Sequence, residues 1–429
     1  MHFLRYKMEE TKVVEKCRSC GKHVLDPIIS LGSHYVSGFV DSSEEQGIKV
    51  PLELVLCSEE DGGCGLLQLK HSAPDSSMWG GQYWYKSGIN EIIKNDLKDI
   101  VDSSKKLVDL KTGDIAVDIG CNDGTLLRYY DKEGLVLVGF DPSTNVAKEA
   151  EVGTDKIINN YFNAKNFKEE LGDKKAKIIT AISMFYDLEN PNEFLEDIKE
   201  ILDEDGLFVI QQNYLVGMLE QNAFDNICHE HREYYSFRSL KKLLDRHDLE
   251  IFDIKFNNIN GGSIRTYIKF NGNNKISPSN EAKTRISDTI KKELQMRLNT
   301  VKPYKKFASR IDGIKDELLN FLKAEKAKGK IIGISGASTR GNTALQYFGL
   351  GPDLITAIEE RNPDKFGKKT LGTFIPIVSE EEMEKIKPDY LLVLIWYFFD
   401  VIKDRKTAFL NNGGKFILHL PKFKIIGGN

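Results

Sequence analysis

The feature that most constrains the fold is an alternation of short apolar runs with helical segments, and it occurs twice. The first set of runs has the length of buried strands and lies at 115–119, 135–140, 178–184 and 206–211. The second set begins after Gly329 and lies at 331–335, 354–358, 390–396 and 415–418. Strands that alternate with helices pair in parallel and form a doubly wound sheet. The chain is therefore predicted to contain two Rossmann-like α/β units.

Length and texture divide the chain into three predicted domains. A chain of 429 residues is too long for one ordinary core. Residues 1–78 contain four of the six cysteines and many turn residues, and we expect a small module there. Residues 79–280 form the first α/β domain and residues 281–429 the second. The charged stretch 281–327 has apolar residues at helical spacing, which predicts one or two bridging helices.

Composition excludes several classes of protein. The formal net charge is −4, and no basic block suits a nucleic-acid backbone. No apolar run approaches the roughly 20 residues that span a bilayer, and residues 1–16 lack the apolar core of a secretion signal. We therefore expect a cytoplasmic protein with reduced cysteines and without nucleic-acid or membrane partners. A monomer would suffice, and a dimer stays open.

Four cysteines have the spacing of a metal site. Cys17 and Cys20 form a C-x-x-C knuckle, and Cys57 and Cys64 supply a second pair. Four thiolates from two loops close a tetrahedral zinc site without an open position, so the predicted role is structural. The second loop is longer than is usual between zinc ligands. Four unrelated buried cysteines are the alternative.

The turn after the strand at 115–119 predicts a ligand site. Gly120 and Gly124 enclose Asn122 and Asp123, and a helix is expected over 125–130. Glycines let the backbone turn sharply and bring a ligand close to a helix N-terminus. The G-x-G-x-x-G pattern of dinucleotide enzymes is absent, because only two of its glycines are present. This favours S-adenosylmethionine over NAD.

Acidic residues end the first two strands of this unit. Asp141 follows the strand at 135–140, where a Rossmann fold places its ribose-binding acid. Asp118, near the end of the first strand, can take the amino group of a methionine moiety. Later loops supply further candidates for the donor site, namely Phe162, Asn163, Ser183, Met184 and Phe185. Core packing of Met184 and Phe185 is the alternative.

The densest polar and aromatic cluster extends from Cys228 to Ser236. His229 and His231 share one face only if the segment is extended, because on a helix they would point about 200° apart. Imidazole titrates near neutral pH, so a histidine general base is the sharper interpretation, with Glu230 orienting it or acting as the base itself. A second metal site lacks a further ligand. Ser236 also suits the N-cap of a following helix.

Over nearly the full length, these motifs resemble those of the sugar C-methyltransferases of deoxysugar biosynthesis. The resemblance rests on several segments together, namely the Cys17 and Cys57 module, Tyr83-Trp84-Tyr85, the Asp118 to Gly124 turn, Asp141-Pro142-Ser143, His229-Glu230-His231, Asn260 to Arg265, Gly336 to Thr343, and Glu360-Arg361-Asn362-Pro363.

The resemblance implies a fold, a cofactor and a reaction. The fold would be a zinc-binding module, a class I methyltransferase domain that binds S-adenosylmethionine, and a C-terminal Rossmann-like domain that contributes to sugar-nucleotide binding. A base would remove the proton next to the ketone of a nucleotide-linked 4-keto deoxysugar, and the enolate would take the methyl group. The base of the family falls on His231, with Glu230 beside it.

Further roles follow from the same resemblance. Cys228 and Tyr83 would belong to the catalytic group, and Tyr85, Pro142 and Ser143 to the donor site. The turn that starts at Gly336 would present amides and a guanidinium to the diphosphate, with plain packing as the alternative. The implied substrate-binding residues are His229, Asn260, Ser263, Arg265, Gly336, Ala337, Ser338, Arg340, Asn342 and Glu360.

The chain departs from the family pattern at the active site. The family commonly has Tyr where Cys228 stands, and Asn-x-Phe-Ala-His where residues 183–187 read Ser-Met-Phe-Tyr-Asp. A thiol cannot hold a ketone oxygen as a phenol does. Two alternatives therefore stay open. One is an O- or N-methyltransferase acting on a sugar nucleotide or another small molecule, and the other is a catalytically degenerate binding module.

Overall fold

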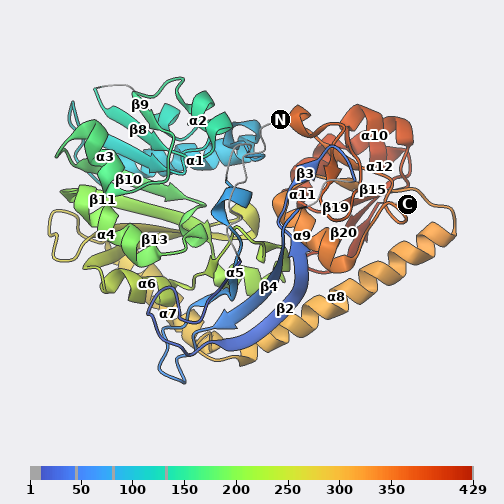
Figure 1. Ribbon diagram of the computed structural model, residues 1–429, viewed down its shortest axis with the longest axis horizontal. Coiled ribbons are helices and arrows are strands. Elements are labelled where there is room, and N and C mark those ends of the chain that lie inside the picture. The colour runs from blue at the N-terminus through green and yellow to red at the C-terminus, as the bar shows by residue number, and fades with distance from the viewer. Residues whose placement is uncertain (1–10, 44–46, 80–82, 131–133, 428–429) are drawn as a thin grey trace, which may run out of the picture.

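The computed structural model describes residues 11–43, 47–79, 83–130 and 134–427. Two α/β units lie at opposite ends of the molecule, and N-terminal strands lie between them (Figure 1). Helix α8 (Lys302–Ala327) extends along the lower edge toward the second unit. Among the described residues, no helix is both long and apolar enough to cross a membrane.

The first α/β unit contains a seven-stranded sheet with the order β13-β14-β11-β10-β7-β8-β9. Five strands are parallel, and β13 and β14 add an antiparallel edge. The strands are β7 (Ile115–Ile119), β8 (Val136–Phe140), β9 (Lys156–Ile158), β10 (Ala176–Ile182), β11 (Leu202–Asn213), β13 (Leu249–Asn257) and β14 (Ser263–Phe270). The helices are α1 (Glu91–Lys105), α2 (Thr144–Ala150), α3 (Ala164–Leu171), α4 (Pro191–Ile201), α5 (Leu215–Glu220) and α6 (Phe237–Asp245). Every residue of β7 is buried, as expected of a central strand.

The helix expected over 125–130 is wrong: only a short 3-10 helix forms at Leu127–Tyr129. Asn122 and Gly124 both adopt positive φ just before it, and Tyr130 is already extended. The Asp123 carboxylate accepts hydrogen bonds from the Thr125 amide and hydroxyl, which favours a tight local turn over a helix.

The second α/β unit contains a six-stranded sheet with the order β18-β16-β15-β19-β20-β21. Its strands are β15 (Ile332–Ser335), β16 (Ile358–Glu360), β18 (Ile377–Ser379), β19 (Tyr390–Val393), β20 (Lys415–Leu418) and β21 (Lys424–Ile426). Its helices are α9 (Thr339–Phe348), α10 (Glu380–Ile386), α11 (Phe399–Arg405) and α12 (Thr407–Asn411). Two predicted strands differ from the observed ones. The run at 354–358 enters the sheet only at its last residue, and the run at 390–396 leaves it after Val393 to form a 3-10 turn.

The charged stretch forms two helices, α7 (Asn280–Met296) and α8. Glu293 of α7 is fully buried, and its carboxylate accepts hydrogen bonds from the Phe237 and Arg238 amides at the start of α6. Ser236 is the N-cap of α6, as predicted, and forms a capping box with Ser239. The helix that follows the polar cluster is therefore fixed at its first turn.

The N-terminal strands contact both α/β units. Their four-stranded sheet has the order β12-β5-β4-β2, with β2 (Asp26–Tyr35), β4 (Lys49–Leu56), β5 (Leu67–Leu69) and β12 (Glu233–Tyr234). Strand β12 belongs to the polar cluster of the first unit. Toward the second unit, β3 (Phe39–Val40) pairs with β17 (Lys369–Thr370), while β1 (Lys12–Val13) pairs with β6 (His71–Ser72).

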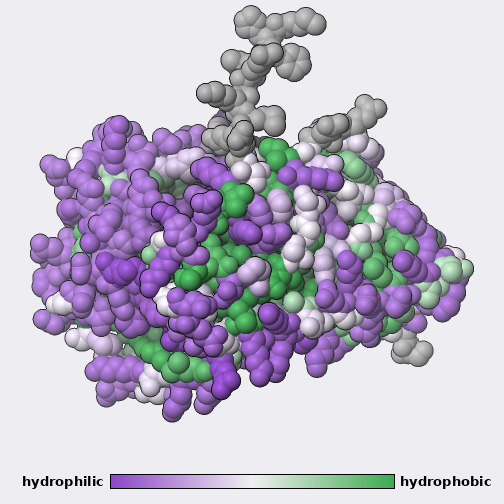
Figure 2. All heavy atoms as spheres, turned by 60° about the horizontal axis from the view of Figure 1, so that its bottom comes forward, coloured by the Kyte–Doolittle hydropathy of each residue, from purple (hydrophilic) through white to green (hydrophobic). Residues whose placement is uncertain are grey.

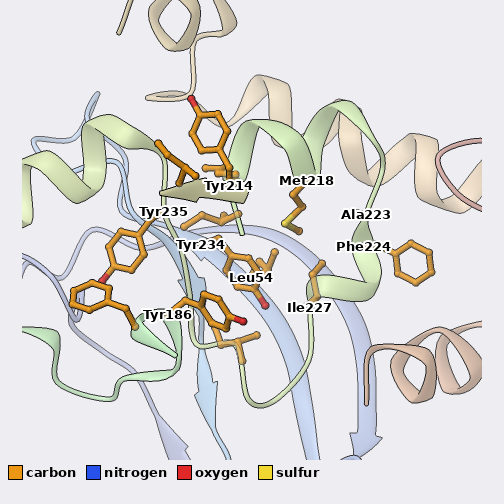
Figure 3. Close-up of a cluster of buried hydrophobic side chains, with 14 of the residues drawn as sticks. Leu54, Tyr186, Tyr214, Met218, Ala223, Phe224, Ile227, Tyr234 and Tyr235 are labelled. Carbon is orange, nitrogen blue, oxygen red and sulfur yellow. The ribbon is translucent and has the colours of Figure 1, made fainter. Parts of the chain in front are cut away.

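An apolar cluster joins these parts. Figure 3 shows Leu54 of β4 in one group with Tyr186, Ile227 and Tyr234 of the first unit. Figure 2 shows apolar side chains gathered in the middle of one face, with mainly polar side chains around them. The module therefore shares a core with the units it joins, because its strands could not bury enough apolar area alone.

Candidate functional site

A cavity of about 570 Å³ lies at the carboxyl ends of the central strands of the first unit. The strand order reverses beside β7, and ligands of doubly wound sheets bind at such a switch point. Ser338, Arg340 and Tyr397 of the second unit also line the cavity. Both α/β units thus contribute to one site.

The donor half of the cavity is built by the turn after β7. The Asp141 carboxylate accepts hydrogen bonds from the amides of Asn122 (2.9 Å) and Ser143 (2.8 Å). Gly120 has a φ of +69°, and a Cβ there would meet Cγ of Met184 at 3.1 Å, so glycine lets Met184 pack against the turn. This turn brings Asp141, Gly120 and Met184 together at the cavity wall.

Asp118 lies deeper in the same wall. Its carboxylate accepts a hydrogen bond of 2.6 Å from the Thr180 hydroxyl. Burial raises the pKa of Asp118 to about 7, against the opposing effect of that hydrogen bond. Burial also raises the pKa of Asp141. Among the described residues, no cation pairs with these two carboxyl groups of the donor half, which suits a cationic ligand that carries ribose hydroxyls.

The segment that contains Tyr83 and Tyr85 is hydrogen-bonded to the donor turn. The Asn122 side chain donates to the carbonyl of Tyr85 (3.0 Å) and accepts from the amide of Ser87 (2.9 Å). Asp123 accepts from the Gly88 amide at 2.7 Å. Both tyrosines line the cavity, whereas Asp123 does not. The Asp123 carboxylate holds this segment and the turn together, and it lies outside the cavity.

The acceptor half contains His231 with one free ring nitrogen. Nδ1 of His231 lies 2.9 Å from the carbonyl oxygen of Asn226, so Nδ1 carries the proton and Nε2 carries the lone pair. Burial first, and the charge of Arg340 second, lower the pKa of His231 to about 3. Its ring meets Tyr186 edge-on at a centroid distance of 4.4 Å. The imidazole is therefore neutral at physiological pH and can accept a proton at Nε2.

Glu230 is the second proton acceptor of this half. It is 8% exposed, and its Oε2 has no hydrogen-bond partner among the described residues. Burial raises the pKa of Glu230 to about 7. Cys228 lines the same cavity, and burial raises its pKa, so it stays a thiol.

Arg340 ties the second unit to the acceptor half. Its Nε and Nη2 donate to Oδ2 of Asp225 at 3.1 and 2.8 Å, and Trp396 donates to the same oxygen at 3.2 Å. The guanidinium lies over the ring of Tyr397 and donates to the carbonyl of Asn260. Asp225 immediately precedes Asn226, whose carbonyl orients His231. The joint between the units therefore lies one residue from the carbonyl that orients the predicted base.

Most of the predicted site residues meet at this cavity. Those that line it are Tyr83, Tyr85, Asp118, Gly120, Asn122, Asp141, Pro142, Ser143, Phe162, Asn163, Ser183, Met184, Cys228, Glu230, His231, Asn260, Ser338 and Arg340. Those that do not are Asp123, Gly124, Phe185, His229, Ser263, Arg265, Gly336, Ala337, Asn342 and Glu360.

The residues outside the cavity have other partners. Arg265 is buried, and its guanidinium pairs with Asp96 and Asp99, which leaves no charge for a substrate. Phe185 belongs to the core, where it packs on Phe194 and Tyr235. His229 lies 3.0 Å from the carbonyl of Val50 and is 1% exposed. Their motif spacing suggested ligands, but their side chains point into packed protein.

Sequence reasoning missed several cavity residues. Asp96, Tyr186, Asp187, Arg232 and Tyr397 line the cavity and were not predicted. Asp187 carried a usable signal, because an acid in the loop that follows β10 stands where this fold gathers its functional groups. Tyr186 belongs to the same loop, and Arg232 belongs to the polar cluster that begins at Cys228. Asp96 and Tyr397 come from segments that the sequence does not relate to the site.

The second candidate centre is the cysteine cluster. The Sγ atoms of Cys17 and Cys64, and those of Cys20 and Cys57, are each 3.5 Å apart. One atom from each of the four cysteines lies within 4.8 Å of all the others. Zinc bound by four thiolates at about 2.3 Å would separate the sulfurs by about 3.8 Å, so the cluster fits the metal. The Cys64 amide also points at Sγ of Cys57 (3.4 Å).

Three family models match consecutive parts of the chain. Residues 17–79 match "Putative zinc binding domain", residues 91–254 match "Methyltransferase domain", and residues 258–421 match "C-methyltransferase C-terminal domain". The chain is also 29% identical to the C-methyltransferase NovU of Streptomyces niveus over 418 residues, which are 96% of this chain and 97% of NovU.

Solved structures resemble part of the chain more distantly. One is the plantazolicin methyltransferase BpumL in complex with SAH, which is 19% identical, covers 41% of this chain and 82% of its own, and has a TM-score of 0.32. Another is an S-adenosylmethionine-dependent methyltransferase from Clostridium acetobutylicum, with 16% identity, 43% and 94% coverage, and a TM-score of 0.33.

The donor cavity and the methyltransferase family model define the chain as an S-adenosylmethionine-dependent methyltransferase. Its zinc-binding, methyltransferase and C-terminal domains follow one another as in the three family models, and the chain is similar to a C-methyltransferase over nearly its full length. The resemblance inferred from the motifs is confirmed at this level. The four cysteines are the zinc-binding group of the first domain.

Proposed function

We propose that this enzyme methylates the carbon next to the ketone of a nucleotide-linked 4-keto deoxysugar. The observation that carries the proposal is the presence of two proton acceptors in the cavity that also holds the donor turn, namely Oε2 of Glu230 and Nε2 of His231. A carbon acceptor needs a base for a C–H proton, and these two atoms are available for it. The full-length likeness to a C-methyltransferase supports the same reaction type.

The base would act from the acceptor half of the cavity. A ketone acidifies the neighbouring C–H, and a positioned base with a pKa near the working pH removes such a proton efficiently. Glu230 has the better matched pKa, about 7, whereas His231 has the free nitrogen and the fixed tautomer. When bound in the donor half, S-adenosylmethionine supplies an electrophilic methyl group to the carbanion. Mutation of each residue in turn distinguishes their roles.

The nucleotide would extend toward the second unit. Ser338 caps α9 and lines the cavity with Arg340. The Arg340 guanidinium is already paired with Asp225, so it would orient a diphosphate through one remaining edge at most. The class of nucleotide is therefore a question for the panel of sugar nucleotides tested below.

The test incubates the protein with S-adenosylmethionine and a panel of 4-keto sugar nucleotides in deuterated water, and follows the sugar by mass spectrometry. We expect gain of one methyl group and, without the donor, deuterium uptake at the α-carbon. His231→Gln should lose both signals, while the matched variant His229→Gln should retain them, because His229 lies outside the cavity. Donor binding without methylation or exchange on any sugar would contradict the proposal and favour an oxygen or nitrogen acceptor.

A further inference from the structure

Asp187 is a cavity residue with a carboxyl oxygen that has no hydrogen-bond partner among the described residues. It ends the 3-10 turn Phe185–Asp187 that follows β10, and it lines the cavity next to the donor-side residue Met184. Its Oδ1 is buried and has no hydrogen-bond partner among the described residues. A buried polar atom without a partner costs free energy, so such an atom in a ligand cavity points to a group supplied by the ligand.

The surroundings of Asp187 compensate its charge only in part, because the charge of Arg232 lowers the pKa of Asp187 less than burial and the charge of Glu230 raise it. Arg232 is near, but its guanidinium donates to the backbone carbonyl of Asp187 and pairs with Asp75 and Glu189. The other titratable groups that face Asp187 are Tyr83, Tyr186, Cys228, Glu230, Glu233 and Tyr234. All of these are neutral or acidic. Burial first, and the charge of Glu230 second, therefore raise the pKa of Asp187 well above its usual value.

A neutral carboxyl group is a hydrogen-bond donor, whereas a carboxylate only accepts. The site needs such a donor, because base-catalysed proton removal places negative charge on the ketone oxygen. The amide of His231 already donates to the carbonyl of Cys228. Asp187 lines the cavity, and its Oδ1 has no hydrogen-bond partner among the described residues.

We propose that Asp187 is a catalytic residue that donates a hydrogen bond to the acceptor oxygen on which negative charge develops. This inference rests on the proposed C-methylation. The base takes the α-proton, the C–H electrons form a carbon–carbon double bond, and the carbonyl π electrons move to the oxygen held by Asp187. In the methyl transfer, the carbon–carbon π electrons form the bond to the methyl group, the sulfur–methyl bond of S-adenosylmethionine breaks, and its electron pair stays on sulfur in the S-adenosylhomocysteine that leaves. The oxygen electrons return to restore the ketone, and Asp187 keeps its proton.

The first test compares Asp187→Ala with Asp187→Asn. We expect Asp187→Ala to lower kcat about 100- to 1,000-fold, the usual effect of removing one such donor, with KM changed only a few-fold. The rate of α-deuterium exchange without the methyl donor should fall equally. The amide of Asp187→Asn also donates, so this variant should recover part of the loss. Unchanged affinity for S-adenosylmethionine would show that each variant is folded.

The second test is the pH profile, which a purely structural role would not change. Wild-type activity should fall as pH rises through the raised pKa of Asp187, because the carboxylate no longer donates. The amide of Asp187→Asn does not titrate, so this alkaline decline should disappear. The tyrosine hydroxyls and the Cys228 thiol have pKa values raised well above their usual range, and they stay neutral meanwhile.

Two outcomes would overturn the inference. One is wild-type exchange in Asp187→Ala, and the other is an alkaline decline that persists in Asp187→Asn. These outcomes differ from failure of the proposed function, in which the wild-type protein binds the methyl donor but neither exchanges nor methylates any 4-keto sugar. In that case the assigned role of Asp187 fails with it.

Discussion

The two α/β units use the same local device, but they neutralise its charges differently. In the first unit the Asn122 amide donates to Asp141 at 2.9 Å, and in the second the Ala337 amide donates to Glu360 at 3.0 Å. In chain order, each acid stands at the end of the second strand of its unit and holds the turn that follows the first strand. The device is therefore a property of the strand-turn geometry and does not by itself identify a ligand.

The difference lies in the cations. In the second unit, Lys365 donates to the carbonyl of Ala337 and lies 3.6 Å from Glu360, and Lys406 binds Glu359 at 2.9 Å. In the first unit no cation pairs with Asp118 or Asp141 among the described residues. Buried carboxyl groups cost free energy unless a charge offsets them. The first unit leaves this compensation to a cationic ligand, and the second completes it within the protein.

The largest expected effect breaks the joint between the units. Asp225→Ala leaves the buried Arg340 guanidinium without its acid and removes the bond from Trp396. Loss of one partner of a buried pair costs about 3–5 kcal/mol, which denaturant unfolding would measure. As a matched control, Asp245→Ala removes the exposed pair with Lys241 and should cost less than about 1 kcal/mol. Equal losses would mean that the joint is not a determinant of stability.

A smaller effect should separate the two turns directly. Asp141→Asn removes a charge and one acceptor from the donor wall, and we expect affinity for S-adenosylmethionine to fall about 30- to 100-fold. Glu360→Gln changes the equivalent acid outside the cavity, so affinity should stay within about twofold. Calorimetric titration of both variants measures the contrast. Similar losses in both would refute the functional difference between the units.

Much of this architecture is predictable from the sequence, because its determinants are local. Period and composition locate most strands, and the Gly120 turn, Asp141 and the N-cap Ser236 are read from neighbouring residues. The cysteine spacing predicts a cluster that the fold brings together. Each of these features depends on a few consecutive residues or on one simple pairing.

What could not be predicted depends on partners far apart in the chain. Arg265 belongs to a motif that suggested a substrate ligand, but Asp96 and Asp99 of α1 take its charge. The pairing of β12 with β5, which attaches the segment after His231 to the cysteine module, has no sequence signal. The role proposed for Asp187 rests on a buried carboxyl oxygen that has no hydrogen-bond partner among the described residues, and a sequence does not reveal such an atom. Charge compensation is therefore the part of the site that sequence patterns leave undetermined.

The smallest expected effect concerns the protonation of Glu230, the uncompensated acid of the acceptor half. Its pKa is raised to about 7, so the fraction in the basic form falls as pH decreases through this value. If Glu230 is the base, kcat/KM should rise about tenfold from pH 6 to pH 8 and by less than about twofold from pH 7 to pH 8, since the profile reports the free enzyme. If His231 is the base, its pKa of about 3 makes the same range nearly flat. Glu230→Gln decides between the two: it should abolish exchange in the first case, and in the second it should leave a measurable exchange rate that does not rise between pH 6 and pH 8.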